Sequence, residues 1–364
     1  QAGHKSCCTG IIGRECADLF DIDVDCVLRE AGSARLFAPS GEFIRVSKPE
    51  PQAYIVDRIL LDRSLARKAE EAGAELRLSS KVTRLSVNER GAELTVSRNG
   101  ESLFYRGETA VIANGFASTF PHELGLGRIK KNIGGAQAVV RNFTLEEVEV
   151  HFGNKIAPGF FAWAVPVSAQ QARVGLMARE KPGEYLRLFL SKLAHEGKTG
   201  DMETPFSYGG IPLKTLPRTY GDRALVVGDA AGQVKPTTGG GIYFGLLCAD
   251  FAADCLESAF SASDFSRDSM ALYEKMWRKK LGHELRIDSL ARSVYNRLSD
   301  KRINDIFTIA RDNNIHESLL ASSYHSFDWH GELVLDGMKR LSPWWQLFGR
   351  YLPNYLIQSV RNRV

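Results

Sequence analysis

The chain lacks several features that would assign its class at once. Its 364 residues contain no uninterrupted apolar run of the about 18 residues that a membrane-spanning helix needs. The six cysteines form no C-x-x-C pair, and the eight histidines show no ligand spacing with them, so the sequence predicts no zinc or iron–sulfur site. No secretory signal is recognisable, which predicts reduced thiols and a cytoplasmic location.

A strong charge of one sign is also missing. The net charge is only +4, and no Lys/Arg block or basic–aromatic stripe accompanies it. We therefore expect no nucleic-acid partner. The hydrophobic content of 44% is ordinary for a globular protein, and the length allows two closely packed domains.

What the chain does have is a glycine-rich stretch in its second half. Residues 224–227 form an apolar run typical of a buried strand, residues 228–232 read GDAAG, and a triple glycine at 239–241 precedes an expected helix over 242–254. A strand followed by a glycine turn and the start of a helix is an arrangement in which the main chain can approach a bound cofactor closely. The alternative is that the glycines only let a helix pack tightly on a sheet. The three consecutive glycines and Asp229, a hydrogen-bond acceptor for sugar hydroxyls, favour cofactor binding.

Three segments carry a resemblance to a known family. Residues 228–246, GDAAGQVKPTTGGGIYFGL, resemble the flavin-binding signature of the geranylgeranyl reductase family of FAD-dependent oxidoreductases, part of a wider group with aromatic hydroxylases and flavin halogenases. Residues 156–166 are similar to the family's P-G-x-Y-x-W-x-F-P segment, with Phe161 in place of Tyr and Val165 in place of Phe. The pattern Tyr54-x-x-x-Arg58-x-x-x-Asp62-x-x-Leu65 is similar to a helix entry of the same family.

The resemblance implies FAD as the cofactor. The cofactor-binding residues that it implies are Arg58, Val82, Gly228, Asp229, Gly232, Pro236, Gly239, Gly240 and Gly241. For Arg58 the alternative is a surface ion pair along its helix, and for Val82 it is a plain strand residue. The helix that begins near Gly241 would direct its positive end toward the anionic edge of reduced flavin.

Substrate and catalytic residues follow from the same resemblance. Phe161, Trp163 and Pro166 would line an apolar substrate pocket over the flavin; the alternative is that these aromatic side chains are core. Cys7 and Cys8, which are not separable, would be catalytic as a proton donor or redox-active thiol. The alternative for them is a buried small residue, since free cysteine is often buried.

The sequence departs from the family in two places. The family's G-x-G-x-x-G unit, which holds the FAD pyrophosphate, is absent, and the sequence begins where the family reads G-x-K-x-C-x-x-G. If the sequence is everything, FAD affinity should be poor. Asn114-Gly115-x-x-Ser118 stands where the superfamily has D-G-x-x-S, so an acceptor is kept and the charge is lost.

The predicted fold class is α/β. We expect a Rossmann-like FAD-binding domain (residues 1–118 and 214–260), interleaved with an antiparallel-sheet substrate domain (119–213), and a helical C-terminal region (261–364). Helices are expected over residues 54–72, 183–197, 266–286 and 289–311, and strands at 74–78 and around the Asn99-Gly100 hairpin turn. An aromatic, basic-flanked amphipathic tail at 343–360 is suited to lie on a membrane or to dock on its own domain.

The predicted function is an FAD-dependent reductase that saturates carbon–carbon double bonds of geranylgeranyl-type chains on a lipid, quinone or pigment precursor. Expected partners are this apolar substrate, an electron donor (reduced flavin, ferredoxin or nicotinamide) and the inner face of a membrane as a peripheral contact. Two alternatives stay open. One is an FAD-dependent monooxygenase or halogenase, and the other is a truncated flavoprotein that acts as a non-catalytic binding module.

Overall fold

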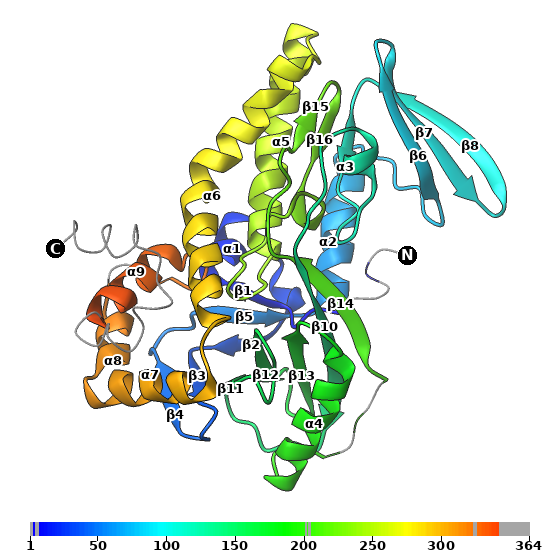
Figure 1. Cartoon of the computed structure of the whole chain (residues 1–364). Helices are drawn as coiled ribbons and strands as arrows, with labels where there is room; N and C mark the ends of the chain where they lie inside the picture. The colour runs from blue at the N-terminus through cyan, green and yellow to red at the C-terminus, as the bar shows by residue number, and fades with distance from the viewer. Residues whose placement is uncertain (1–2, 4–6, 201, 203–204, 323–325, 342–364) are drawn as a thin grey trace. The chain divides into compact units, whose positions relative to one another are not determined.

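The structure is a computed structural model that describes residues 3, 7–200, 202, 205–322 and 326–341 (Figure 1). The chain divides into two compact units. The first unit comprises Gln1–His4, Ile59–Asn132 and Ile211–Leu285. The second unit comprises Lys5–Arg58, Ile133–Gly210 and Arg286–Val364.

The first unit contains two small sheets. One sheet has the order β15-β16-β9, in which β16 runs parallel to β9 and antiparallel to β15. The other is the antiparallel sheet β6-β7-β8. The strands are β6 (Lys81–Asn88), β7 (Gly91–Arg98), β8 (Glu101–Gly107), β9 (Ala110–Ile112), β15 (Tyr220–Gly221) and β16 (Ala224–Val226). Leu85 of β6, Ile112 of β9 and Val226 of β16 share one buried core.

The turn between β7 and β8 explains the register of that sheet. Asn99 has φ +51° and Gly100 has φ +87°, the two positive values that a two-residue hairpin turn needs to follow the strand twist. Arg98 accordingly pairs with Glu101 directly across the turn. The predicted hairpin at Asn99-Gly100 is confirmed.

Helices pack around these sheets. They are α2 (Arg58–Glu71), α3 (Phe120–Glu123), the 3-10 turn η2 (Gly228–Ala231), α5 (Ile242–Ala262) and α6 (Arg267–Tyr295), whose last residues belong to the second unit. Figure 1 shows α5 and α6 running side by side, and the Cys255 thiol of α5 points at the Met270 carbonyl of α6. Buried Cys248 and Ala252 give α5 small side chains, which permits this close approach.

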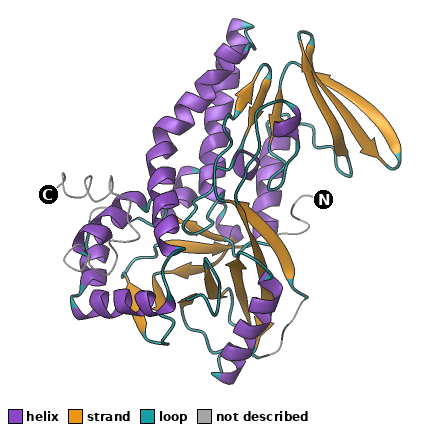
Figure 2. Ribbon diagram, viewed as in Figure 1, coloured by secondary structure: helices purple, strands orange, loops and turns teal. Residues whose placement is uncertain are grey.

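The second unit is built on a seven-stranded sheet with the order β14-β10-β13-β12-β11-β3-β4. Strands are drawn in orange in Figure 2. The pairs β10–β13, β12–β13, β11–β12 and β3–β4 are antiparallel, and the pair β11–β3 is parallel. The strands are β3 (Ser33–Phe37), β4 (Phe43–Ser47), β10 (Asn132–Arg141), β11 (Val148–Phe152), β12 (Phe161–Pro166), β13 (Gln171–Ala178) and β14 (Ser207–Pro212).

Helix α4 (Pro182–His195) covers one face of this sheet. Leu186, Phe189 and Leu193 recur at helical spacing on its buried side and pack on Ala162 and Ala164 of β12. Burying a large apolar side chain of this kind stabilises by about 1.5–3 kcal/mol. The packing of α4 therefore fixes which face of β12 is left for Phe161 and Trp163.

A three-stranded sheet, β1-β5-β2, packs on the opposite side through Ile55 and Val165. Its elements are β1 (Ile11–Gly13), α1 (Arg14–Leu19), the 3-10 turn η1 (Val24–Cys26), β2 (Val27–Ala31) and β5 (Ala53–Val56). The C-terminal helices of this unit are α7 (Asp300–Asp312), α8 (Ile315–Leu320) and α9 (Gly331–Arg340). The predicted fold class is thus confirmed.

Three predicted elements were wrong in detail. The helix expected over 54–72 begins at Arg58, because Tyr54-Ile55-Val56 pairs as a strand with β1 and β2. Residues 74–78 form no strand. The predicted helices over 266–286 and 289–311 imply a break at 287–288. The structure has no break there, because this part of α6 contains no glycine or proline and the helix continues to Tyr295.

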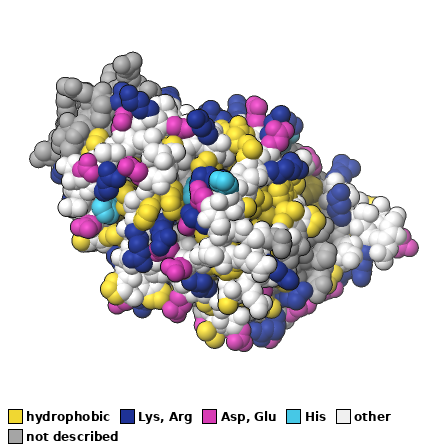
Figure 3. Space-filling view, turned by 90° about the horizontal axis from the view of Figure 1, so that it is seen from below, with side chains coloured by type: hydrophobic (Ala, Val, Ile, Leu, Met, Phe, Trp, Pro, Cys, Tyr) yellow, Lys and Arg dark blue, Asp and Glu magenta, His cyan; other side chains and the backbone are white. Residues whose placement is uncertain are grey.

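None of the helices in the described part of the chain combines the length and the apolar character that crossing a lipid bilayer requires. Figure 3 shows acidic and basic side chains interspersed over one face of the molecule. The predicted amphipathic tail at 343–360 lies outside the described residues. The predicted division into three functional domains stays a prediction.

Candidate functional site

The GDAAG turn follows directly on strand β16. Gly228 has φ +68° and Gly232 has φ +76°, so both adopt the conformation that favours glycine. A Cβ on Gly232 would overlap the Lys214 carbonyl oxygen, whereas a Cβ on Gly228 would meet no atom within 4 Å. Gly232 is therefore required for packing, while Gly228 leaves an open stretch of backbone.

A buried chain of hydrogen bonds holds the turn against its strand. The Gly228 N–H donates to Gln233 Oε1 at 2.8 Å, and Gln233 Nε2 donates to the Tyr273 hydroxyl at 2.8 Å. The Tyr273 hydroxyl in turn donates to the Val226 carbonyl at 2.9 Å. Burial raises the pKa of Tyr273 well above its ordinary value, so the hydroxyl stays a neutral donor. Sequence reasoning missed Gln233 and Tyr273; the glutamine directly after the GDAAG turn was the available signal.

The loop after the turn leads into the N-terminus of α5. Two backbone hydrogen bonds lie within this loop. The Lys235 N–H donates to the Gly240 carbonyl at 3.1 Å, and the Gly239 N–H donates to the Lys235 carbonyl at 2.9 Å. Gly241 is the N-cap of α5 and supplies no side-chain cap, so the first N–H groups of this 21-residue helix favour a negative group nearby. A Cβ on Gly241 would lie 3.0 Å from Asp229 Oδ1, which places the Asp229 carboxylate beside the helix start.

A cavity of about 290 Å³ adjoins the turn. Among its lining residues are Phe116, Ser118, Asn132, Pro212, Asp229 and Ala230. The hydroxyl of Ser118 is buried and has no hydrogen-bond partner among the described residues, and the same holds for Thr237 in the loop before α5. Buried polar atoms are nearly always paired, so these two hydroxyls are ready for a polar ligand.

These residues fit a flavin dinucleotide. The open Gly228 backbone lets a ligand approach closely, Asp229 can accept hydrogen bonds from hydroxyl groups, and the α5 N-terminus favours anionic charge. The two unsatisfied hydroxyls would donate to ligand oxygens. The structure therefore brings Gly228, Asp229 and Gly232 together with the triple glycine before α5.

The loop that contains Cys7 and Cys8 (residues 7–10, here called the cysteine loop) belongs to the second unit. Arg173 Nη1 donates to the Thr9 carbonyl at 2.6 Å and to the Val56 carbonyl at 3.1 Å. Gln137 Nε2 donates to the Cys8 carbonyl at 3.3 Å. Since Arg173 and Gln137 are on neighbouring strands β13 and β10, the loop is tied to the seven-stranded sheet. The amide N–H of Gly10 donates to Cys8 Sγ at 3.3 Å.

The two predicted cysteines differ in environment. Cys7 is exposed as a residue and Cys8 is half-buried, and both thiols are free. The sulfur of Cys7 nevertheless faces the sheet, because a Cβ on Gly209 of β14 would lie 3.4 Å from it. Desolvation there raises the pKa of Cys7, and the hydrogen bond with Ser207 opposes this only in part. At neutral pH Cys7 is therefore a protonated thiol, suited to donate a proton.

Two aromatic side chains, Phe161 and Trp163, lie on the face of β12 opposite α4, where Trp163 also packs against the buried Ile55 and Val165. Phe161 and Trp163 are half-buried with ring centroids 6.2 Å apart, and Phe161 stacks on Phe160 at 4.6 Å. The Trp163 indole crosses Gly175 of β13 so closely that a Cβ there would lie 2.6 Å from the ring. Trp163 Nε1 is buried and has no hydrogen-bond partner within the described chain. Pro166 ends the strand and is buried.

Two of the remaining predicted cofactor residues, Arg58 and Val82, lie outside the GDAAG turn and the loop before α5. Arg58 is the first residue of α2 and is half-buried. Val82 on β6 pairs with Val96, and it is not a member of the core that Leu85 of the same strand shares with Val226. Pro236 lies in the buried loop before α5. The roles of all the predicted site residues stay predictions.

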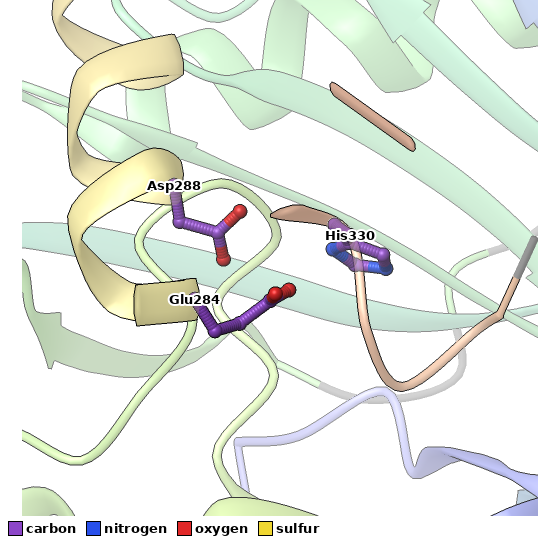
Figure 4. Close-up of side chains that lie close together, drawn as sticks. All are labelled: Glu284, Asp288 and His330. Carbon is purple, nitrogen blue, oxygen red and sulfur yellow. The ribbon is translucent and has the colours of Figure 1, made fainter. Parts of the chain in front are cut away.

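A group of metal-ligand type lies on α6 and just before α9. Glu284, Asp288 and His330 each place one ligand atom within 4.8 Å of the others (Figure 4). Asp288 is fully buried, and His330 Nε2 lies 2.8 Å from the Phe327 carbonyl, to which it donates. Two carboxylates beside an imidazole occur in ion-pair clusters as well as in cation sites, so the group by itself assigns no ligand.

Comparison with known proteins identifies the family. No family model matches the chain. The sequence is 31% identical over 280 residues to the digeranylgeranylglycerophospholipid reductase of Methanocaldococcus jannaschii, which covers 74% of this chain and 71% of that protein. The chain belongs to the geranylgeranyl reductase family. The reductase of the same name from Methanothrix thermoacetophila is 28% identical over 318 residues, covering 82% of this chain and 80% of the relative.

Solved structures share the fold of this geranylgeranyl reductase family member. A geranylgeranyl bacteriochlorophyll reductase-like protein from Thermoplasma acidophilum superimposes with a TM-score of 0.82 at 21% identity, over 95% of this chain and 90% of the other. A flavin-dependent brominase superimposes with a TM-score of 0.67 at 13% identity, over 94% and 91%. The predicted family is confirmed, and the protein is an FAD-dependent oxidoreductase.

Proposed function

We propose that the protein reduces carbon–carbon double bonds in isoprenoid chains of the geranylgeranyl type. The observation that carries the proposal is the open Gly228 turn beside the uncapped N-terminus of α5, in a chain whose relatives are named digeranylgeranylglycerophospholipid reductases. The substrate class follows those names: a glycerol-linked polyprenyl lipid first, with a quinone or pigment precursor as the wider class.

Bound, reduced FAD supplies hydride transfer to one alkene carbon. The chain's own residues would do the rest. The N-terminus of α5 would stabilise negative charge on the cofactor, and Asp229 would orient its hydroxyl-bearing chain. Gln233 and Tyr273 would keep the turn in the shape that both interactions need.

An unactivated alkene also needs a proton and a dry, aligned environment. The protonated Cys7 thiol is the group proposed to donate the proton, with Cys8 as the neighbouring candidate. Phe161 and Trp163 are proposed to hold the apolar chain, because both present half-buried aromatic faces from one strand. Pro166 would bound that pocket.

We also propose which parts of the chain bind cofactor and substrate, where the protein acts, and what reduces it. The cofactor-binding part would include the GDAAG turn and α5, and the substrate-binding part the seven-stranded sheet. A lipid-borne substrate favours peripheral contact with the cytoplasmic face of a membrane. The electron donor would be reduced flavin, ferredoxin or a nicotinamide nucleotide.

Product analysis tests the proposal. Purified protein with FAD and dithionite is incubated without oxygen with a digeranylgeranyl glycerophospholipid, and the lipid is examined by mass spectrometry. The expected product gains two hydrogen atoms for each double bond saturated. A fully saturated lipid is the control substrate. Unchanged lipid here, together with oxygen-dependent oxidation of an aromatic substrate, would contradict the reductase and favour a monooxygenase.

A further inference from the structure

Cationic side chains gather on the first unit from three segments that are far apart in the chain. The segments are residues 127–132, 213–219 and 275–280, and they contain no aspartate or glutamate. Six of their cations take part in no ion pair within the described part of the chain. These six, here called the basic belt, are Lys130, Lys131, Lys214, Arg218, Lys275 and Lys279. The whole chain has a net charge of only +4, so positive charge is concentrated on this surface.

Hydrogen bonds tie the three segments together. The Leu213 N–H donates to the Lys131 carbonyl at 2.8 Å, which joins the first segment to the second. Trp277 Nε1 donates to the Thr219 hydroxyl at 2.9 Å in the interior, which joins the second segment to α6. The middle segment therefore touches both of the others, and the basic belt is one surface of the first unit.

The acidic residue that directly precedes the third segment does not neutralise the belt. Glu274 Oε2 accepts hydrogen bonds from the Thr219 N–H at 2.8 Å and from the Thr219 hydroxyl at 2.9 Å. Glu274 Oε1 accepts one from Arg278 Nε at 2.8 Å. The like charges of the belt repel one another in the folded protein, and a negative partner would relieve that repulsion.

The composition of the belt favours a lipid surface over a protein as that partner. Five of its six cations are lysines, whereas protein–protein interfaces are enriched in arginine and depleted in lysine. A cluster of about four to eight lysines and arginines suits the diffuse negative charge of anionic headgroups. Leu272 of α6 is 39% exposed and lies three and seven residues before Lys275 and Lys279, on the same face of the helix. An exposed leucine beside lysines is typical of surfaces that rest on a bilayer.

We propose that the basic belt is the surface through which the first unit binds an anionic lipid bilayer, with Leu272 entering the headgroup layer. The proposal deepens the proposed function and rests on it in part, because a lipid-borne substrate has to be reached from a bilayer. The binding itself requires no catalysis.

Vesicle flotation tests the role of charge. Wild-type protein is mixed with vesicles of phosphatidylcholine alone, or of equal parts of phosphatidylcholine and phosphatidylglycerol, and the bound fraction is measured against lipid concentration. The protein should bind the anionic vesicles and not the neutral ones, and added KCl should release it, because salt screens exposed charges. Each lysine near an anionic surface contributes about fivefold, so Lys275→Ala combined with Lys279→Ala should weaken binding by about 25-fold.

A matched pair of substitutions shows whether the effect is local. Lys81→Ala combined with Arg84→Ala removes two exposed cations of β6, outside the three segments, and changes the net charge by the same amount. This variant should bind anionic vesicles like the wild type. Lys214→Glu should weaken binding more than Lys214→Ala. Circular dichroism and thermal melting show that each variant is folded.

Fluorescence quenching tests the contact of Leu272 with the bilayer. In Leu272→Trp the added indole should be quenched when the anionic vesicles contain brominated lipid, after the wild-type signal is subtracted. Phe104→Trp, on β8, is the control, because Phe104 is 80% exposed and lies outside the three segments. Its added indole should stay unquenched.

Equal binding to neutral and anionic vesicles would overturn the proposal, as would equal losses in the belt variant and the β6 variant. Quenching of Phe104→Trp without quenching of Leu272→Trp would place the bilayer on another surface. A wild type that binds soluble poly-L-glutamate but no vesicles would assign the belt to an acidic protein and overturn the membrane assignment. Neither readout uses flavin reduction, so a negative result here is distinct from failure of lipid reduction.

Discussion

Gln233 and Tyr273 are joined by a 2.8 Å hydrogen bond between two fully buried side chains. Because Gln233 also accepts from the Gly228 N–H, a residue of α6 controls the shape of the turn that is proposed to face the flavin. The two side chains are 40 residues apart in sequence. The turn is therefore a tertiary feature and not a local one.

Removing the Tyr273 hydroxyl should affect both stability and cofactor binding. Tyr273→Phe leaves Gln233 Nε2 and the Val226 carbonyl without a partner in the core, which should lower the free energy of unfolding by about 1–3 kcal/mol. Urea unfolding with and without FAD measures this, and the FAD-induced stabilisation should shrink. Tyr220→Phe, in the neighbouring strand and outside this network, is the control. Wild-type FAD affinity in Tyr273→Phe would contradict the positioning role.

Gly175 is predicted to be essential for the orientation of Trp163. In Gly175→Ala the added methyl group would lie 2.6 Å from the indole, so the ring must move, at a cost of about 1–3 kcal/mol. Trp163 fluorescence, obtained by subtracting the spectrum of Trp163→Phe, should shift. Gly135→Ala in β10 is the matched control, because its Cβ would meet no atom closer than 3.4 Å. An equal response of the two glycine variants would be evidence against tight packing at Gly175.

The buried Glu149–His151 pair predicts a loss of stability in acid. Burial alone would raise the pKa of Glu149, but hydrogen bonds from His151 and Lys198 outweigh it and hold the pKa below its ordinary 4.5. Burial lowers the pKa of His151 from its ordinary 6.5, and this effect of burial is larger than the opposing effect of Glu149. In both cases the unfolded chain binds protons more readily, so stability is fully present above about pH 6.5 and falls as the pH falls.

Unfolding measured across pH tests this linkage. His151→Gln should reduce the pH dependence of the free energy of unfolding just below pH 6.5. Lys198→Met should instead change this dependence at lower pH, where Glu149 titrates. His195→Gln, at the exposed end of α4, is the control for a histidine outside the pair. A wild-type stability that rises on acidification from pH 6.5 to pH 5 would have the wrong sign.

Cys7 should react slowly with alkylating reagents. Its raised pKa leaves little thiolate at neutral pH, so in Cys8→Ser the iodoacetamide rate should increase with pH and have its midpoint above the ordinary value of 9.0. The other four cysteines are buried and should react more slowly still in the folded protein. Ser207→Ala removes the hydrogen bond that lowers the pKa of Cys7 and should slow the reaction further. A midpoint near neutral pH would mean that Cys7 is a thiolate and not a proton donor.

The sequence predicted the parts of the site that depend on local chemistry. The glycine turn, the α5 start and the Asn99-Gly100 hairpin follow from residues that are neighbours in the chain, and the structure has them where expected. It could not predict the Gln233–Tyr273 contact, the arginine that ties down the cysteine loop across 164 residues, or the parallel pairing of β3 with β11. These depend on which distant segments meet, and no local pattern encodes that.

The most direct test of the central claim is the absorbance of the reduced flavin when lipid is added. Holoprotein is bleached with a measured amount of dithionite without oxygen, and a digeranylgeranyl glycerophospholipid is then mixed in. The account predicts that the oxidised flavin spectrum returns in proportion to the double bonds reduced, and that a saturated lipid has no effect. A flavin that stays bleached with the polyprenyl lipid and recovers only with oxygen would contradict it.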